Sequence, residues 1–181
     1  MKTNRIIEEL RAIASLPLNP EQKAFYEKRA ADARPVECVR MRDAFTPEQL
    51  RFIFGIAEYK CRQKQCYKNA SNLVQITNFI RTELKMPMPV VKYVEGYAYS
   101  YGLLPIEHAF VKVGDKYIDP TFERALHRDV RKELYAVLME FDCDEMERLQ
   151  AETGYYGELY EYSYIKQFRP DLAARMAARN R

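Results

Sequence analysis

The chain has 181 residues, of which 48% are hydrophobic and 13% are aromatic, and its formal net charge is +3. This composition excludes an intrinsically disordered chain, and the length is typical of one globular domain spanning residues 1–181. Because lysines and arginines are interspersed with acidic residues rather than gathered in blocks, the sequence does not predict a protein that binds nucleic acid.

Residues 1–18, MKTNRIIEELRAIASLPL, differ from a signal peptide. They have no uninterrupted apolar core and contain a pair of adjacent glutamates, so they are typical of an amphipathic helix, which we expect over residues 3–15. No window of the sequence is long and apolar enough to cross a bilayer. We therefore expect a cytoplasmic protein that does not bind membranes; export by a route without a cleaved signal is the alternative.

Further helices are predicted in the next part of the chain. Residues 21–33 form one of them, bounded by a proline on either side. Another begins at TPEQ, residues 46–49, with Thr46 as the N-cap and Gln49 where a capping box requires it. We expect this helix to run to about Lys60.

A stronger helical pattern begins at Cys66. Apolar or small side chains recur at intervals of three and four along CYKNASNLVQITNFIRTEL, and KMPMP ends the helix near Lys85. The pattern then changes to period two, with β-branched and aromatic residues that predict strands over residues 90–101, 108–113 and 116–119.

The last third of the chain returns to helical patterns after Pro120. We expect a helix over about 129–152 and a closing helix over residues 170–181. Between them, the tyrosine-rich segment TGYYGELYEYSY, residues 153–164, predicts a strand packed on the sheet; a loop, or a segment that lines a substrate groove, is the alternative. Helices followed by strands and then by helices predict an α+β domain.

The dipeptide Gly114-Asp115 predicts a two-residue hairpin turn between the last two strands. Counting outward from this turn pairs Phe110 with Asp119, so the side chains of His108, Phe110 and Asp119 share one face. From a diagonal position, the Asp119 carboxylate can accept the imidazole proton of His108, which makes a general base with its orienting group. The alternative is a half-buried histidine that pairs with an aspartate at a strand end.

Cys66 is the candidate nucleophile for such a base. It starts the predicted helix, where unpaired amides and the helix dipole favour a thiolate and the Cys66 amide itself points to where an oxyanion would form. The alternative is a small core residue that continues the apolar stripe. The other cysteines, Cys38, Cys61 and Cys143, lie beside no orienting motif, and the spacing of cysteines and histidines predicts neither a metal nor another cofactor.

The stretches QCYKNA, YVEGYA and IEHAFVKVGDKYIDPTF together resemble the papain-like and transglutaminase-like thiol enzymes, over about residues 60–123. The resemblance implies a core over about residues 46–123, in which a helix carrying the cysteine packs on an antiparallel sheet carrying the histidine and the aspartate, with extra helices at both ends of the chain. It also implies that Cys66 is the nucleophile, His108 the base and Asp119 the orienter.

Some residues depart from the family pattern. Phe110 stands where the family usually has tryptophan. Papain-type peptidases have an oxyanion glutamine several residues before the cysteine, whereas Gln65 and Gln63 lie nearer to Cys66, so their part in holding an oxyanion or substrate stays open.

These residues predict a thiol hydrolase that forms an acyl-enzyme on an amide or isopeptide bond of a protein or peptide, as a peptidase or a glutamine deamidase does. Hydrolysis is preferred because transfer to an amine requires a second bound substrate, for which the sequence has no motif. A transglutaminase-type acyltransferase and a catalytically silent protein-binding module on the same fold are the alternatives. Nothing in the sequence predicts the oligomeric state.

Overall fold

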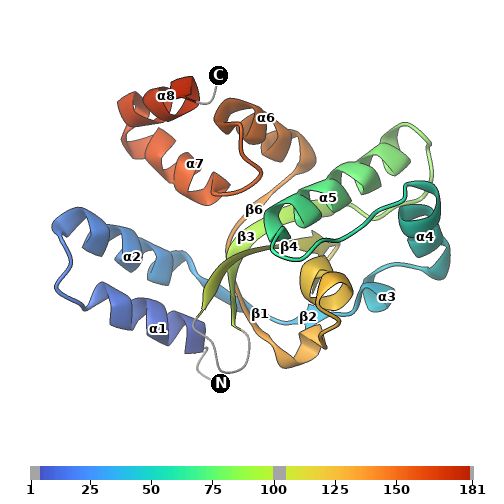
Figure 1. The fold of residues 1–181 in the computed structure, drawn as a ribbon, viewed down its shortest axis with the longest axis horizontal. Coiled ribbons are helices and arrows are strands. Elements are labelled where there is room, and N and C mark those ends of the chain that lie inside the picture. Colours follow the sequence, from blue (N-terminus) through green and yellow to red (C-terminus); the bar gives the residue numbers. More distant parts are fainter. Residues whose placement is uncertain (1–4, 100–104, 180–181) are drawn as a thin grey trace.

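A six-stranded sheet with helices packed against it forms the fold in a computed structural model, which describes residues 5–99 and 105–179 (Figure 1). Neighbouring strands are antiparallel except for the last pair, which is parallel. The predicted α+β class is confirmed. In spatial order the strands are β1 (Arg34–Val36), β6 (Leu134–Phe141), β3 (Val91–Tyr99), β4 (Ile106–Val113), β5 (Lys116–Ile118) and β2 (Cys38–Val39).

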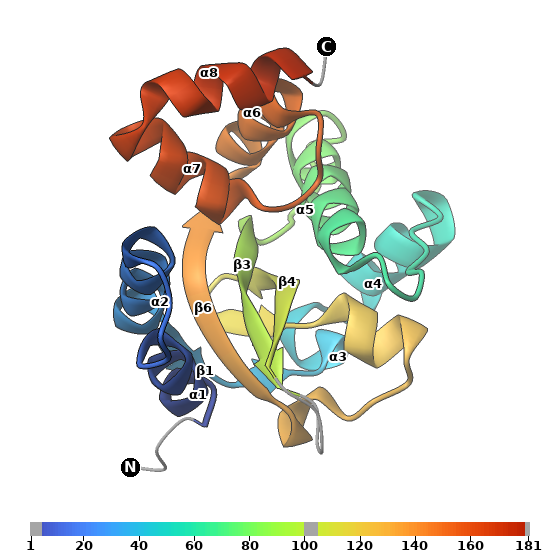
Figure 2. The same cartoon turned by 60° about the vertical axis from the view of Figure 1, so that its left-hand side comes forward.

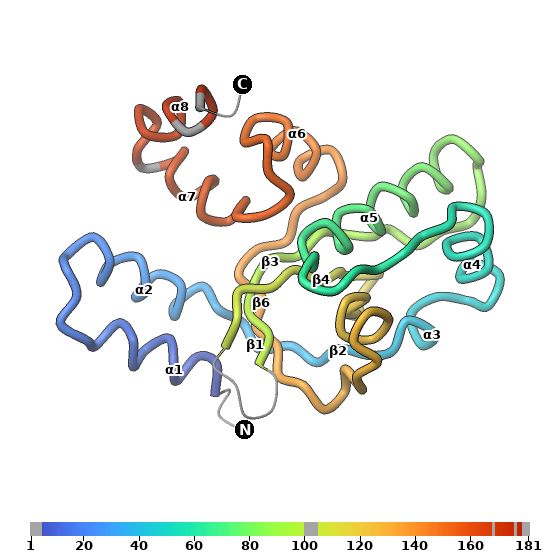
Figure 3. Tube along the Cα trace, viewed as in Figure 1, coloured from blue at the N-terminus to red at the C-terminus, as the bar shows by residue number. Residues whose placement is uncertain are grey.

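The helices lie before, between and after the strands, and Figure 3 shows α1 and α2 as a helical hairpin. Short π-helical turns follow α4 and β5, and a 3-10 turn precedes β6. The helical elements are α1 (Arg5–Ala14), α2 (Pro20–Asp32), α3 (Met41–Ala44), α4 (Pro47–Arg51), η1 (Phe52–Ile56), α5 (Cys66–Thr82), η2 (Thr121–Ala125), η3 (Val130–Lys132), α6 (Cys143–Thr153), α7 (Leu159–Phe168) and α8 (Pro170–Arg179).

The sheet is covered on both faces, as the alternation of side chains along β3 shows. Tyr93 packs in a cluster with residues of α5 and α6, and Tyr97 packs with residues of α1 and α2. Val94, which points the other way, packs in a third cluster with Phe122 and Val130. The helices α1, α2, α5 and α6 thus cover one face, and η2 and η3 cover the other. In Figure 2, α1 and α2 lie beside β6, and α5 lies beside β3 and β4.

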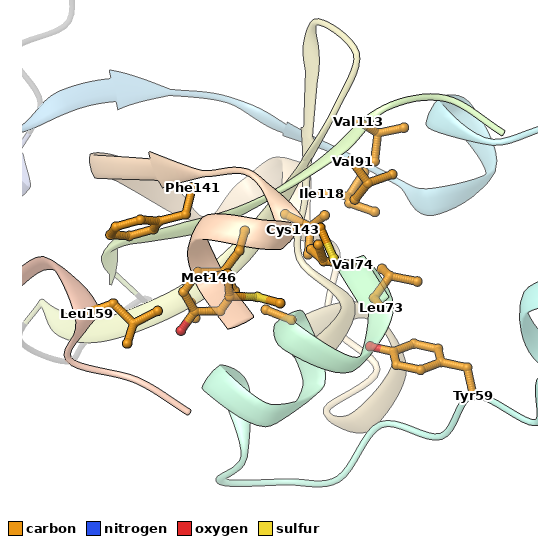
Figure 4. Packing of buried hydrophobic residues seen from close by; sticks show 14 of the residues in the cluster. Tyr59, Leu73, Val74, Val91, Val113, Ile118, Phe141, Cys143, Met146 and Leu159 are labelled. Atoms are coloured by element: carbon orange, nitrogen blue, oxygen red, sulfur yellow. The ribbon is translucent and has the colours of Figure 1, made fainter. Parts of the chain in front are cut away.

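The largest cluster fixes α5 against the hairpin formed by β4 and β5 (Figure 4). Leu73 and Val74 of α5 are fully buried against the strands that contribute Val113 and Ile118, and Met146 of α6 closes the cluster. Burial of a side chain of this size is worth about 1.5–3 kcal/mol. Helix α5 is thereby held on the strands that carry the candidate site residues.

Several predicted elements are confirmed. The helices expected over 3–15, 21–33 and 66–85 occur as α1, α2 and α5, with ends that differ by a few residues. The capping box is present, because the Thr46 side chain accepts from the Gln49 amide and the Gln49 side chain accepts from the Thr46 amide. The helix that follows does not reach Lys60: it continues beyond α4 only as the π-helical turn η1.

The helix predicted over 129–152 is wrong in its first half, which contains η3 and the strand β6, between β1 and β3 in the sheet. The run LYAVLMEF, residues 134–141, is apolar almost throughout, and such a run fits a buried strand as well as a buried helix. Asp142 separates the strand from α6, because its side chain accepts a hydrogen bond from the Glu145 amide and caps the helix.

The strand predicted for the tyrosine-rich segment 153–164 is also wrong. Gly154 ends α6 in the left-handed conformation, and α7 begins at Leu159. The Tyr160 amide at the start of α7 donates to the Glu95 carboxylate of β3, 2.8 Å away. The capping carboxylate belongs to a residue far away in the sequence. The residues around the start of α7 therefore could not predict it.

Gly96 lies where β3 and β6 approach too closely for a side chain. A Cβ at this position would be 2.0 Å from the Ala136 carbonyl oxygen, next to the irregularity in the pairing of these strands. We predict that Gly96→Ala lowers the free energy of unfolding by at least about 2 kcal/mol, because the strands must move apart. Urea denaturation measures this change.

Gly55 provides the matched control. A Cβ added there meets nothing within 4 Å, and the backbone is not in the left-handed region. Gly55→Ala should change the free energy of unfolding by less than about 1 kcal/mol. Equal denaturation midpoints for the two variants would contradict the close approach of β3 and β6.

Candidate active site

The hairpin formed by β4 and β5 brings His108 and Asp119 together. Its register pairs Val113 with Lys116 and Val111 with Ile118, as counted from the turn, and Gly114 at the tip has φ of 60°. The Nε2 atom of His108 lies 2.8 Å from Asp119 Oδ2. The predicted turn, the predicted pairing and the contact between the two side chains are confirmed.

Asp119 is fully buried, and hydrogen bonds reach both of its carboxylate oxygens. Oδ1 accepts from the backbone amides of Thr121 and Phe122, at 2.9 and 3.0 Å. Oδ2 accepts from the Tyr135 hydroxyl, at 3.1 Å, in addition to its bond with His108. A carboxylate held at both oxygens cannot rotate freely, so it fixes the orientation of the imidazole ring.

His108 is packed among aromatic rings and is only 2% exposed. The Phe122 ring centroid lies 4.7 Å from that of the imidazole, and Phe110 stacks on it at 6.4 Å. Burial acts to lower the pKa of His108, but the charge of Asp119 and the hydrogen bond to it outweigh burial and raise the pKa to about 10. At neutral pH the imidazole is therefore protonated.

Cys66 is the first residue of α5 and is half-buried. Because Asp119 occupies Nε2 of His108, Nδ1 is the ring nitrogen available for the hydrogen bond between Cys66 and His108. Burial acts to raise the pKa of the Cys66 thiol, but the His108 imidazolium and the backbone amides of Ala109 and Tyr67 outweigh it and lower the pKa. These shifts favour a thiolate–imidazolium pair.

The other cysteines have the opposite electrostatic environment. Burial raises the pKa of Cys38 well above its ordinary value, and it also raises the pKa of Cys61. Burial and the nearby acidic side chains of α6 raise the pKa of Cys143 to about 11. All of these thiols, including Cys66, are free. Only the Cys66 pKa is lowered.

Asn69 organises the loop before Cys66, a role that the sequence analysis missed. Its side chain accepts from the Arg62 amide at 3.0 Å and donates to the Arg62 carbonyl at 2.7 Å. It also donates to the Thr121 hydroxyl at 3.0 Å, two residues after Asp119. Asn69 thus joins the loop, the first turns of α5 and the segment that holds Asp119.

Tyr135 was also missed, because it lies in the segment predicted as a helix. As a residue of β6 it is fully buried, and its hydroxyl reaches Asp119 across the sheet face that carries His108. The capping residue Asp142 is the feature of the sequence that would have separated this strand from the following helix.

The candidate oxyanion glutamines lie in different environments. Gln65 occupies the N-cap position of α5, but its side chain makes no capping hydrogen bond. Gln63 is exposed, and its side-chain amide donates to the Ala125 carbonyl at 3.3 Å. Their role in binding an oxyanion or substrate stays a prediction.

Comparison with known proteins gave no match: no family model, no curated protein and no solved structure matches the chain. Within residues 5–99 and 105–179, no helix has the length and apolar character that a membrane crossing requires. The same residues contain no cluster of three or more histidine, cysteine or carboxylate side chains that could hold a metal ion.

The lowered pKa of Cys66 predicts a distinctive pH dependence of alkylation. Because the thiolate is the nucleophile, iodoacetamide should modify Cys66 at pH values below 9.0, the ordinary pKa of a thiol, where the other cysteines react slowly. His108→Gln should raise the Cys66 pKa and slow its alkylation near pH 6 by about tenfold for each unit of that rise. Peptide mapping by mass spectrometry gives the rate at each cysteine.

His127→Gln is the matched control, since His127 is exposed and is the only other histidine of the chain. This variant should leave the pH profile of Cys66 unchanged. Faster labelling of Cys61 or Cys143 than of Cys66 in the native protein would show that the electrostatic assignment is wrong.

Proposed function

We propose that this chain is a thiol hydrolase that cleaves an amide or isopeptide bond of a protein or peptide through an acyl-enzyme on Cys66. The observation that carries the proposal is the chain of hydrogen bonds from Cys66 through His108 to Asp119, buried except for the cysteine end. A nucleophile, a base and an orienting group linked in this order are the parts that covalent acyl transfer requires.

In the first step, the Cys66 thiolate attacks the carbonyl carbon of the substrate, and the C–S bond forms as the carbonyl π electrons move to oxygen. The backbone amide of Cys66 is the proposed donor to this oxyanion, because the first amides of a helix such as α5 have no partner within the helix. The imidazolium of His108 then gives its Nδ1 proton to the leaving nitrogen, and the C–N bond breaks. Asp119 keeps the ring oriented during this transfer.

In the second step, neutral His108 takes a proton from water, and the resulting hydroxide attacks the thioester carbonyl. The C–S bond breaks, the carboxylic acid product leaves, and the thiolate–imidazolium pair is restored. A peptidase releases an amine in the first step, whereas a glutamine deamidase releases ammonia. Water requires no binding site of its own, so hydrolysis is ranked before transfer to an amine.

The sequence resemblance supports the same chemistry and a papain-like or transglutaminase-like core over about residues 46–123. Within this range α5, which begins at Cys66, packs on the antiparallel strands β3, β4 and β5. A catalytically silent binding module on this fold would not require a lowered pKa of the Cys66 thiol. The reactivity of Cys66 therefore distinguishes the two functions.

Acylation by an activated ester tests the proposed function without knowledge of the substrate. With p-nitrophenyl acetate, the wild-type chain should accumulate one acetyl group on Cys66, followed by steady release of acetate. Cys66→Ala should abolish this acylation, and Asp119→Asn should slow it by at least about tenfold without abolishing it, because an orienting group can be partly bypassed. Intact mass and p-nitrophenolate release measure both steps.

Cys61→Ala is the control, since Cys61 is also partly exposed and lies in the loop before α5. It should acylate at the wild-type rate. Acetylation spread over several cysteines, or equal rates for Cys66→Ala and wild type, would contradict acyl-enzyme formation on Cys66.

A further inference from the structure

Glu95 of β3 is a buried carboxyl group close to Cys66 that the proposed reaction does not use. Its side chain is 4% exposed and, two residues from Tyr93, points to the face of the sheet covered by α5 and α6. Across the strands it lies opposite Ala109, whose backbone amide bonds to the Cys66 sulfur. Its Oε2 atom accepts from the Tyr160 amide at 2.8 Å, and its Oε1 atom contacts the Tyr93 hydroxyl.

The Tyr93 hydroxyl has two close oxygen neighbours but only one proton. Glu95 Oε1 lies 2.8 Å away, and the backbone carbonyl oxygen of Tyr156 lies 2.9 Å away. Both contacts have the length of an O–H···O hydrogen bond, and each such bond requires its own proton. A carbonyl group has none, so the second proton has to come from Glu95. When Glu95 is a carboxylic acid, it donates to Tyr93, and Tyr93 donates to Tyr156.

The surroundings of Glu95 move its titration from acid to neutral pH. Burial raises its pKa most, and the charge of Glu107 on β4, which in turn pairs with Arg29 of α2, adds to the rise. The first amides of α7 and the Tyr93 hydroxyl lower the pKa, and the resulting value is about 7. On α5, burial raises the pKa of Tyr67, and the charge of Glu95 adds to that rise. Glu95 therefore keeps its proton in mildly acidic solution and loses it around neutral pH.

Residues 155–158, which lead from the end of α6 to α7, lie against the first turn of α5. A Cβ added at Gly157 would be 2.4 Å from ring atoms of Tyr67, so the backbone of this segment rests directly on the ring. Tyr67 follows Cys66, and its backbone amide bonds to the cysteine sulfur. The segment thus supports a residue that is part of the environment of the nucleophile.

Two side chains hold this segment at the carbonyl of Tyr156. The Tyr93 hydroxyl donates at 2.9 Å, and the uncharged Gln150 side chain of α6 donates at 3.0 Å. Glu158, at the end of the segment, has φ of 62° and gives α7 no side-chain cap, so the cap comes from Glu95. Of the two bonds to the carbonyl, the one from Tyr93 depends on the proton of Glu95.

Resting on the proposed function, we propose that Glu95 is a positioning residue whose protonated form holds residues 155–158 against Tyr67 and whose ionised form releases them. Ionisation gives the Glu95 proton to solvent, and Tyr93 then donates to the carboxylate. The carbonyl of the segment loses this donor and faces a hydroxyl oxygen without a proton between them. The segment separates from Tyr67, and the approach to Cys66 on this side widens.

Glu95→Gln tests the protonation directly, because a glutamine amide donates to Tyr93 and accepts from Tyr160 at every pH. Folded wild type keeps a proton up to about pH 7, whereas the unfolded chain loses it near the ordinary pKa of 4.5, so wild-type stability falls relative to the variant as the pH rises. From pH 5 to pH 8, the unfolding constant of wild type relative to Glu95→Gln should rise at least about tenfold. Urea denaturation measures both constants, and a ratio independent of pH would overturn the proposal.

Hydrogen exchange of the amides of residues 155–158 measures the release. At pH 8.5 these amides should exchange at least about fivefold faster in wild type than in Glu95→Gln, and at pH 5.5 the rates should agree. Tyr93→Phe, which lacks the hydroxyl, should exchange faster than wild type at pH 5.5. Glu83→Gln, at an exposed position at the other end of α5, is the control and should match wild type at both pH values. Equal exchange in wild type and Glu95→Gln at pH 8.5, or in wild type and Tyr93→Phe at pH 5.5, would overturn the release.

Two alkylating agents with the same reactive group test the consequence for Cys66. The ratio of the rates with N-benzyl iodoacetamide and iodoacetamide cancels the thiolate fraction, because both react with the same sulfur. From pH 5.5 to pH 8.5 this ratio should rise at least about fivefold in wild type and stay constant in Glu95→Gln. A constant ratio in wild type would overturn the positioning role while leaving the thiol chemistry intact. A Cys66 that is inert to iodoacetamide would overturn the proposed function, whereas urea denaturation and hydrogen exchange would still decide the protonation of Glu95 and the release of the segment.

Discussion

The charge of Asp119 is the interaction on which the electrostatics of the site depend. Burial alone would keep His108 neutral and Cys66 a thiol, because His108 is fully buried and Cys66 is partly removed from water. The Asp119 carboxylate reverses this preference at His108, and the imidazolium then reverses it at Cys66. Hydrogen bonds from Tyr135 and from the start of η2 hold the carboxylate in place. Asp119 and its hydrogen bonds thus stabilise a pair of opposite charges in a hydrophobic environment that by itself opposes charge.

The sequence was sufficient for the part of the site that local geometry determines. The turn at Gly114-Asp115 sets the register of β4 and β5, and strand periodicity then puts His108 and Asp119 on one face. Cys66 at the start of α5 followed from helical periodicity in the same way. The α+β class was predicted correctly for the same reason. The strands of the sheet have apolar residues with period two, and the helices have them at intervals of three and four.

Contacts between distant segments could not be predicted. Residues 134–141 became the strand β6 because they pair with β1 and β3, and a uniformly apolar run does not show which backbone form it will take. The support of Asp119 by Tyr135 depends on that pairing. Likewise, α7 is capped by Glu95 of β3 rather than by a nearby residue.

The protonation state of His108 tests the central claim most directly. Since the chain contains only His108 and His127, nitrogen-15 NMR of the imidazole rings resolves both, and His127→Gln assigns them. We predict that His108 is an imidazolium at pH 8 and loses its proton only near pH 10. Asp119→Asn should lower this titration, because it removes the charge that opposes burial. A His108 ring that is neutral at pH 7 in the wild-type chain would contradict the thiolate–imidazolium pair.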